Sequence, residues 1–553
     1  MTQRFPALFL ILTASLFILN LVQSSVTELI YDEAYYWYYA QNLDWGYFDH
    51  PPMVAFMIKL SGFLFYGELG VRFMSCLLSI GTYIILWSTI DNSKKREHVP
   101  VFFLLLFSIT LMNAYGFLTL PDTPLLFFTT LFLFLYKNYL EKPSYPLAIG
   151  IGLVMAALMY SKYHAVLIIF FVLLSNLKLL RDIRAWVAVV VALICYVPHF
   201  QWLIQHDFVS IKYHTFERPN QAYSFTKFTL GYFVNLIAIF GLPFFWVYKA
   251  LIKTKTTGLF TKALKYLCYG VLIFFFISSF NRRVQTQWVI IISIPMAIMT
   301  FNYILENTAS RKWVFRMGLI SLVIMLYARI WLVHKPLLPI LFETHGNKAW
   351  VSELKEKSQG VPVVFENSYR RAPMYEFYAG IPSYTLNNHM YRRNQYTIDS
   401  SEERMRNKRI LYVTKYAKSG DIQYLHPDKK TVFYGRFMDN FESFRKLQCI
   451  VDTTTTKNLY ALKIYNPYNF DVPLSDLSFT AAFSNAYKQV KDLQPIQVEI
   501  QQKSLQSIKS KDTVQFQFEL PKTNMENPVY FRVGISENGL HPGLNGTPFK
   551  IIE

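Results

Sequence analysis

The sequence predicts a polytopic α-helical membrane protein with a C-terminal soluble region that is first α/β and then β-rich. Hydrophobic residues make up 53% of the chain and aromatic residues 17%. Apolar segments of membrane length recur through the first 335 residues, and they stop near Pro336. The roughly 215 residues that follow are enough to bury a core of their own.

The apolar segments define the predicted membrane domain. A bilayer core of about 30 Å requires roughly 20 apolar residues in a helix, and about eleven segments meet this criterion. We interpret the first as an uncleaved signal anchor, because it is long for a cleaved signal peptide. The segments span residues 6–23, 70–90, 99–118, 124–140, 145–161, 163–179, 185–203, 228–248, 264–280, 287–305 and 314–333.

The distribution of basic residues predicts the orientation. The chain carries 55 Lys and Arg against 36 Asp and Glu, a formal net charge of +19. With the N-terminus inside, the cytoplasmic loops hold more than twice as many Lys and Arg as the external connections, as the positive-inside rule requires. The basic excess therefore indicates a membrane surface rather than a nucleic acid, and we expect the C-terminal region to lie outside the cytoplasm.

The C-terminal region shows strand and helix patterns. Residues 361–365 and 409–414 are predicted strands, and residues 368–379 a helix that ends at Gly380. Alternating segments predict strands over 459–465, 496–501 and 513–520, and Thr453–Thr456 is interpreted as a linker. The predicted domains are 1–335 (membrane), 336–450 (α/β) and 451–553 (β-rich).

Asp32 and Glu33 open an aromatic segment shortly after the first apolar segment. Ionisable groups at membrane level are costly and mark functional sites. A carboxylate near a hydroxyl can act as a general base, although acids at a helix N-terminus can also simply stabilise the helix.

Asp49 and His50 stand in Phe48-Asp-His-Pro-Pro52, just before an apolar helix predicted over 53–65. An acid with a histidine can form half of a divalent-cation site or a phosphate clamp. Turn formation is the simpler interpretation of the same residues.

Two external turns carry further candidates. Asp122 lies between prolines in Thr119-Leu-Pro-Asp-Thr-Pro124, a pattern that is structural in many proteins. Lys162 precedes Tyr163 and His164 in a tight turn, where it could bind an anion or extend to water.

Two later connections are mostly basic. One contains His214 and Arg218, and the other contains Arg282 and Arg283. Arginines suit bidentate phosphate recognition, whereas ordinary contact with lipid headgroups is the alternative. Acids and cations around one membrane face indicate a site for an anionic lipid whose head reacts.

These motifs, in this order, resemble those of the GT-C membrane glycosyltransferases, in the bacterial branch related to protein O-mannosyltransferases and lipid A aminoarabinose transferases. The resemblance covers roughly residues 1–335. It implies a bacterial inner-membrane enzyme that transfers a sugar from a polyprenyl-phosphate donor to a lipid A, glycan or protein acceptor on the external face. No Gly-rich nucleotide motif is present, and no nucleotide cofactor is expected.

The resemblance also implies residue roles. Asp32 matches the general base, with Glu33 supporting it. Asp49 matches an acidic position that helps to hold a divalent cation, and His214 a possible metal ligand. His50 stands where aminoarabinose transferases have lysine. Basic residues that would stabilise the leaving phosphate are Lys162, Arg218, Arg282 and Arg283, and Asp122 belongs to the same substrate-binding set.

Two other classes of protein remain as alternatives. A transporter or flippase of lipid-linked sugars could also use a charged external cavity, but such proteins usually carry midplane charges and paired halves. A receptor or scaffold would leave the Asp32–Glu33 and Asp49–His50 motifs unexplained.

Overall fold

The computed structural model describes residues 5–454, 456, 458–500 and 505–551. The chain forms two compact units. The first comprises Met1–Asp207 and Tyr223–His345, and the second comprises Phe208–Ala222 and Gly346–Glu553. Segment 208–222, which the sequence placed in a loop between two spans, thus folds with the C-terminal region.

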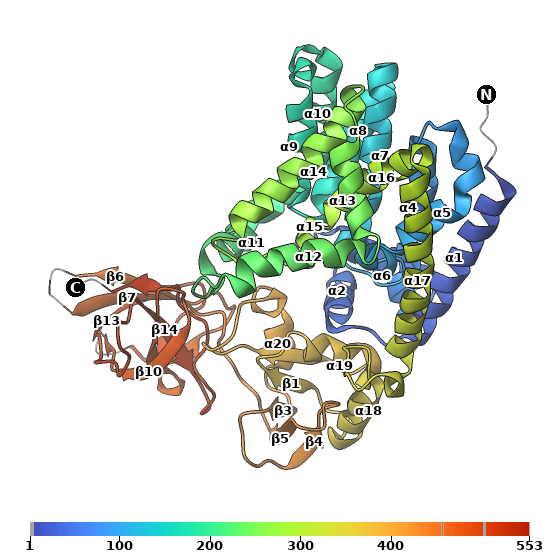
Figure 1. The fold of residues 1–553 in the computed structure, drawn as a ribbon. Helices are drawn as coiled ribbons and strands as arrows, with labels where there is room; N and C mark the ends of the chain where they lie inside the picture. The colour runs from blue at the N-terminus through green and yellow to red at the C-terminus, as the bar shows by residue number, and fades with distance from the viewer. Residues whose placement is uncertain (1–4, 455, 457, 501–504, 552–553) are drawn as a thin grey trace. The chain divides into compact units, whose positions relative to one another are not determined.

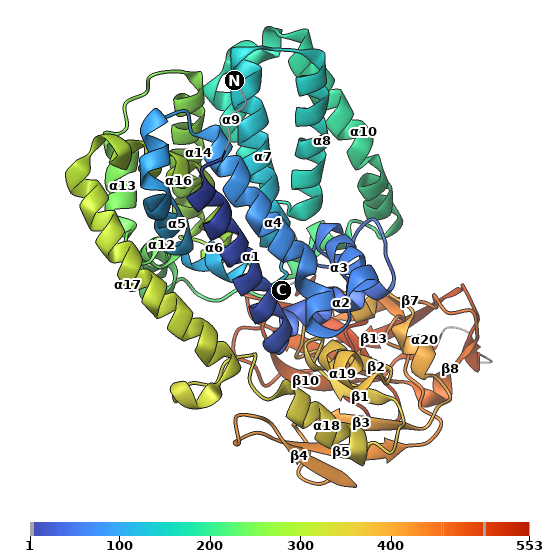
Figure 2. The ribbon, with the colours of Figure 1, turned by 90° about the vertical axis from the view of Figure 1, so that its right-hand side faces the viewer.

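The first unit is helical (Figure 1). Helices α7 and α8, which follow each other in the sequence, lie side by side, and α8 also packs against α10 (Figure 2). Its α-helices are α1 (Ala7–Val26), α2 (Tyr31–Gln41), α3 (Met53–Leu64), α4 (Gly67–Thr89), α5 (Val99–Phe107), α6 (Thr110–Ala114), α7 (Asp122–Glu141), α8 (Tyr145–Ser161), α9 (Ala165–Ser175), α10 (Ile183–Gln205), α12 (Gly231–Phe240), α13 (Phe244–Lys253), α14 (Leu259–Ser278), α15 (Thr286–Val289), α16 (Ser293–Glu306) and α17 (Thr308–Val333).

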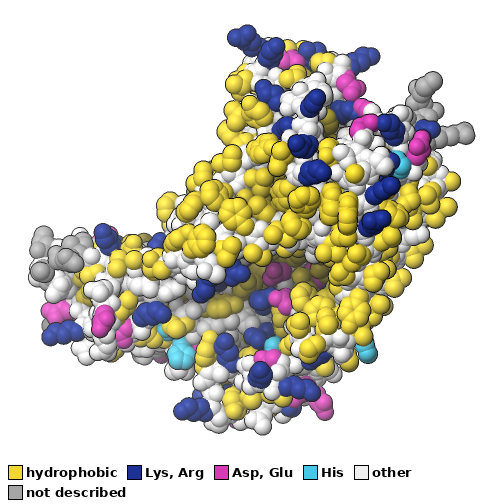
Figure 3. Space-filling view, in the orientation of Figure 1, with side chains coloured by type: hydrophobic (Ala, Val, Ile, Leu, Met, Phe, Trp, Pro, Cys, Tyr) yellow, Lys and Arg dark blue, Asp and Glu magenta, His cyan; other side chains and the backbone are white. Residues whose placement is uncertain are grey.

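Six helices in the described part of the chain are long and apolar enough to cross a membrane, and the bent pair α12–α13 makes a seventh if it is one span. Large apolar side chains such as Ile194, Ile204 and Val323 are exposed on the long helices, as lipid contact requires. Figure 3 shows hydrophobic side chains covering the visible flank of this unit. The unit is therefore a multi-pass membrane domain, while the count of about eleven spans stays a prediction.

Two predicted spans are broken. Segment 99–118 divides into α5 and α6 at Ile109, whose backbone is extended, and α5 is almost wholly buried inside the unit. Segment 228–248 bends by 97° between α12 and α13. Gly241 makes this bend with φ of +57°, and a Cβ there would come within 2.9 Å of the Ser108 carbonyl oxygen.

The second unit begins with a five-stranded sheet in the order β2-β1-β3-β5-β4. β1, β2 and β3 are parallel, whereas β4 and β5 are antiparallel. This confirms the predicted α/β pattern, including the helix end at Gly380, which has φ of +70°. The elements are α11 (Val209–Lys212), α18 (Asn347–Lys357), β1 (Val363–Glu366), α19 (Arg371–Ala379), β2 (Ser383–Leu386), α20 (Ser401–Met405), β3 (Ile410–Thr414), β4 (Ile422–Leu425) and β5 (Val432–Met438).

The remaining strands form two four-stranded sheets, β10-β9-β14-β15 and β11-β13-β7-β6, and a short pair, β12-β8. Side chains from both four-stranded sheets share one hydrophobic core. The strands are β6 (Gln448–Thr453), β7 (Leu459–Tyr465), β8 (Val472–Pro473), β9 (Ser478–Ser484), β10 (Val490–Ile496), β11 (Glu499–Ile500), β12 (Ser507–Ile508), β13 (Thr513–Glu519), β14 (Tyr530–Ser536) and β15 (Phe549–Lys550).

Two predictions in this region need correction. The strand expected over 496–501 is wrong, because β10 ends at Ile496 and β11 covers only Glu499–Ile500, while residue 501 lies outside the described residues. The linker expected at Thr453–Thr456, of which residue 455 is not described, connects β6 and β7. These strands are antiparallel neighbours in one sheet, so the segment joins strands rather than domains.

Candidate active site

Glu33 lies in the first turn of α2 and is completely buried. Its two oxygens accept four hydrogen bonds, from Arg72 Nε at 2.7 Å, Arg72 Nη2 at 2.6 Å, the Thr119 backbone N–H at 2.8 Å and the Ile30 backbone N–H at 3.2 Å. A carboxylate that accepts this many hydrogen bonds is held in one position. Glu33 therefore fixes α2 in place.

Arg72 on α4 is also completely buried. Besides Glu33, its guanidinium donates to the backbone carbonyls of Ser24 at 3.0 Å, Thr27 at 2.6 Å and Glu28 at 3.0 Å. These carbonyls lie at the end of α1 and just after it, where helical carbonyls lose their partners. One side chain thus joins the end of α1, the start of α2 and α4.

Asp32 precedes Glu33 and remains partly exposed. The buried Glu33–Arg72 pair holds the first turn of α2 and so fixes the backbone that carries Asp32. Of the two predicted catalytic acids, Glu33 is committed to structure, and Asp32 is the one within reach of solvent or substrate.

The Pro-Asp-x-Pro turn is tied to the same network. Thr119 donates its hydroxyl to the Val71 carbonyl at 2.9 Å and lies 2.7 Å from the Ser75 hydroxyl. Asp122 follows at the start of α7 and pairs with Lys162, whose Nζ lies 2.8 and 2.9 Å from the two carboxylate oxygens. Both of these side chains are buried, so Lys162 has an internal counter-ion.

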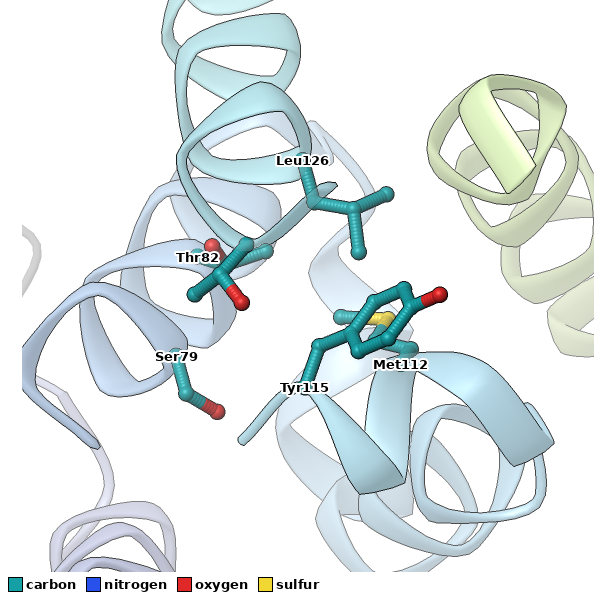
Figure 4. Close-up of a pocket in the computed structure, with 6 residues that line it drawn as sticks. Ser79, Thr82, Met112, Tyr115 and Leu126 are labelled. Carbon is teal, nitrogen blue, oxygen red and sulfur yellow. The ribbon is translucent and has the colours of Figure 1, made fainter. Parts of the chain in front are cut away.

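Tyr115 is buried shortly before the turn that carries Asp122. Tyr115 also lines a small pocket between α4, α6 and α7 (Figure 4). The figure shows Ser79 and Thr82 on one side, facing Met112 and Tyr115 on the other. No carboxylate or basic side chain lines this pocket, so we assign the chemistry to the neighbouring carboxylates instead.

The segment with Asp49 and His50 packs against α2. Tyr35 donates its hydroxyl to Asp49 at 3.1 Å, and Tyr36 meets the His50 ring edge to face, with centroids 5.5 Å apart. Both tyrosines are buried, and these contacts hold the predicted motif against α2.

α10 supplies residues that the sequence analysis missed. His199 is completely buried and lies with Nδ1 2.7 Å from the Trp45 carbonyl, and Trp202 donates to Asp44 at 2.8 Å. A Cβ on Gly46 would come within 2.4 Å of the Trp202 ring, so only glycine fits there. The sequence signal that could have identified them is a histidine and a tryptophan within an otherwise apolar helix.

Arg282 and Arg283 lie just after α14, Arg282 partly buried and Arg283 exposed. Trp288 in the following α15 stacks on His164 with ring centroids 5.6 Å apart. This contact brings the arginine-bearing connection to the turn that contains Lys162.

His214 and Arg218 fall in segment 208–222, which folds with the second unit. Asp49 and His214, the predicted metal ligands, thus belong to different units. Among the described residues, no three His, Cys, Asp or Glu side chains form a group suited to a metal ion. We therefore derive no step through a metal, and the divalent cation stays a prediction.

Fold and site together define a class: a multi-pass membrane protein in which hydrogen bonds and two buried ion pairs, Glu33–Arg72 and Asp122–Lys162, hold the predicted motifs. Residues 49–202 match the family model described as dolichyl-phosphate-mannose-protein mannosyltransferase. The lipid A galacturonosyltransferase RgtD of Rhizobium johnstonii (strain DSM 114642 / LMG 32736 / 3841) is 27% identical over 219 residues, which cover 37% of this chain and 45% of that protein. The chain thus matches less than half the length of this curated relative.

Two crystal structures of ArnT from Cupriavidus metallidurans share the fold. The apo form has a TM-score of 0.55 at 13% identity, and the form bound to undecaprenyl phosphate has 0.53 at 15%. Each match covers 77% of this chain and 97% of the ArnT chain. These comparisons confirm the predicted resemblance to GT-C membrane glycosyltransferases and the predicted fold class.

Proposed function

We propose that the chain is a glycosyltransferase that moves a sugar from a polyprenyl-phosphate donor to an envelope acceptor. Three findings support the proposal: the mannosyltransferase family match, the similarity to a lipid A galacturonosyltransferase, and the fold shared with an ArnT that binds undecaprenyl phosphate. None of these relatives is described as a transporter, so the flippase alternative is not favoured.

The observation that carries the proposal is that Asp32 and Glu33, although adjacent, have different surroundings. Glu33 is buried with four hydrogen bonds, and partly exposed Asp32 is held beside it. In the reaction, an acceptor hydroxyl gives its proton to Asp32 while its oxygen attacks the anomeric carbon. The bond from that carbon to the phosphate oxygen breaks, and polyprenyl phosphate leaves with the bonding electrons.

Cations must stabilise the charge on the departing phosphate. Arg282 and Arg283 suit this role, because guanidinium groups bind phosphate in a bidentate manner. Lys162 directs two of its three N–H groups to Asp122, so it can offer a phosphate only the third. We therefore assign stabilisation of the leaving phosphate chiefly to Arg282 and Arg283.

The acceptor and location form the finer part of the proposal. The name of the relative RgtD makes lipid A the first acceptor to test, with other glycans and proteins as further candidates. The excess of Lys and Arg on alternate loops supports a bacterial inner-membrane protein with its C-terminal unit outside the cytoplasm.

The test is Asp32→Asn in the full-length chain, expressed in cells that lack the native protein. Because general-base catalysis contributes about 10²- to 10⁴-fold, transfer should fall by about that factor while membrane yield is unchanged. Mass spectrometry of envelope lipids, glycans and proteins would identify the missing sugar.

Asp91→Asn is the matched control, since Asp91 pairs with Lys137 away from the site and is largely exposed. It should retain full transfer. Normal turnover by Asp32→Asn would remove the proposed base, and accumulation of donor on the wrong leaflet would favour a flippase.

A further inference from the structure

The C-terminal edge of the parallel strands in the second unit has the geometry of a ligand site. The chain leaves β1 through α19 to reach β2 on one side, and β3 lies on the other side of β1. Loops that diverge in this way leave a crevice beyond the strand ends, where α/β sheets usually bind ligands. Asn367 follows β1 directly, and Asn387 follows β2.

Asn367 is a buried donor at this edge. Its side-chain oxygen accepts a hydrogen bond from the Asn388 backbone N–H at 2.8 Å, which fixes the orientation of the amide. The amide nitrogen donates to no described residue, although the residue is only 9% exposed. Its φ of +52° is also unusual for a residue other than glycine.

Asn387 repeats the pattern. It is only 3% exposed, its side-chain oxygen accepts from the Thr385 hydroxyl at 3.1 Å, and its amide nitrogen has no acceptor among the described residues. Buried polar groups in native proteins nearly always have a partner. Two such donors at one sheet edge point to a ligand that supplies acceptor oxygens.

Guanidinium groups surround the same edge. The charges of Arg370, Arg371 and Arg392 all act on the hydroxyl of Tyr391. Arg392 also stacks over the Tyr369 ring at 4.3 Å and donates to the Tyr213 hydroxyl at 3.2 Å. The edge is therefore strongly cationic and carries aromatic faces.

Two carboxylates of this unit, Glu366 and Glu217, have partners within it. Glu366 at the end of β1 accepts from Asn388 Nδ2 at 2.7 Å and from the Thr414 hydroxyl at 2.5 Å. Glu217 lies 3.7 Å from Arg393, on the segment that also carries the predicted His214 and Arg218. The oxygens of a phosphate or carboxylate group would suit the two amide donors, and its negative charge would suit an edge rich in arginine.

We propose that this sheet edge binds a phosphate or carboxylate group, with the Asn367 and Asn387 amides donating to its oxygens. The assignment of that group to an anionic acceptor glycolipid rests on the proposed glycosyltransferase function. Binding itself does not, because it is measured without turnover.

The experiment measures binding to the full-length protein in detergent by calorimetry, with inorganic phosphate as one probe and diphosphorylated lipid A dispersed in the same detergent as the other. Asn367→Asp keeps the fixed acceptor oxygen and the backbone preference but replaces the donor with a negative charge. We expect at least a tenfold loss of affinity, and a similar loss for Asn387→Asp.

Asn440→Asp is the matched control. Asn440 also has φ of +52°, is exposed, and follows β5 at the opposite end of the sheet. It should bind like the wild type. If Asn367→Asp does not fold, Arg370→Gln provides the same comparison, because it removes a charge without altering the amides.

The outcomes separate the possible sources. Loss of lipid A binding alone supports a glycolipid ligand, and equal loss of phosphate binding supports a site for any phosphate. An unchanged affinity in Asn367→Asp, an equal loss in Asn440→Asp, or no binding of either probe would overturn the site. Phosphate binding is measured without turnover, so a failure of the transfer reaction would remain distinguishable from a failure of this site.

Discussion

The two units each bury an arginine–glutamate pair, and the two pairs differ in how many hydrogen bonds their charged groups make. In the helical unit, Glu33 and Arg72 are aligned for two hydrogen bonds, and backbone groups satisfy the rest. In the C-terminal unit, Arg445 Nε lies 3.0 Å from Glu537 Oε1 but outside hydrogen-bond alignment, and both carboxylate oxygens lack a described donor. The Glu33–Arg72 pair holds the candidate active site in position. The Arg445–Glu537 pair leaves the Glu537 carboxyl group easy to protonate.

Removing one partner of the satisfied pair should have the largest effect on stability. Arg72→Met leaves Glu33 as an uncompensated buried charge, which costs about 3–5 kcal/mol. Thermal unfolding in detergent should show the loss. The double variant Arg72→Met/Glu33→Leu should recover part of it, and an equally unstable double variant would contradict this account.

The Asp122–Lys162 pair tests whether a buried pair also has a catalytic role. Lys162→Gln alone should destabilise the protein by about 2–4 kcal/mol, because Asp122 loses its counter-ion. Asp122→Asn/Lys162→Gln should restore stability. If Lys162 contacts the donor phosphate, the double variant keeps a raised KM for the donor, whereas a normal KM assigns the pair to structure alone.

The Arg445–Glu537 pair should make the free energy of unfolding depend on pH. Burial raises the pKa of Glu537 to about 7, from an ordinary value of 4.5. Between these values the folded state binds more protons than the unfolded state, so the free energy of unfolding should fall as pH rises from about 4.5 to about 7. The total change is about 3–4 kcal/mol. Glu537→Gln should remove this part of the pH dependence, and an unchanged pH profile would refute it.

Thr119→Val should produce the smallest effect. The variant loses the hydroxyl contacts to Val71 and Ser75 but retains the backbone N–H that donates to Glu33. We expect about 1 kcal/mol of destabilisation and only a slight fall in kcat. A large fall in kcat without loss of stability would mean that the turn contributes directly to the reaction.

Much of the active-site prediction came from residues that are costly at membrane level. Asp32, Asp49 and Asp122 stood out because acids are rare there, and the structure connects their motifs through Glu33, Tyr35 and Thr119. Arg72 was not predicted, since it lies inside an apolar segment 39 residues from its partner. His214 and Arg218 were also predicted for this site; their segment folds with the C-terminal unit, and their role stays a prediction.

By itself, the sequence determined the membrane class, the apolar helices and the α/β and β-rich patterns, because hydrophobic periodicity and length are local properties. Only the tertiary structure decided which acid is held and which remains accessible, and it placed Asn367 and Asn387 at one sheet edge. Hydrogen-bond partners are chosen by packing between distant segments, and no local pattern encodes that choice.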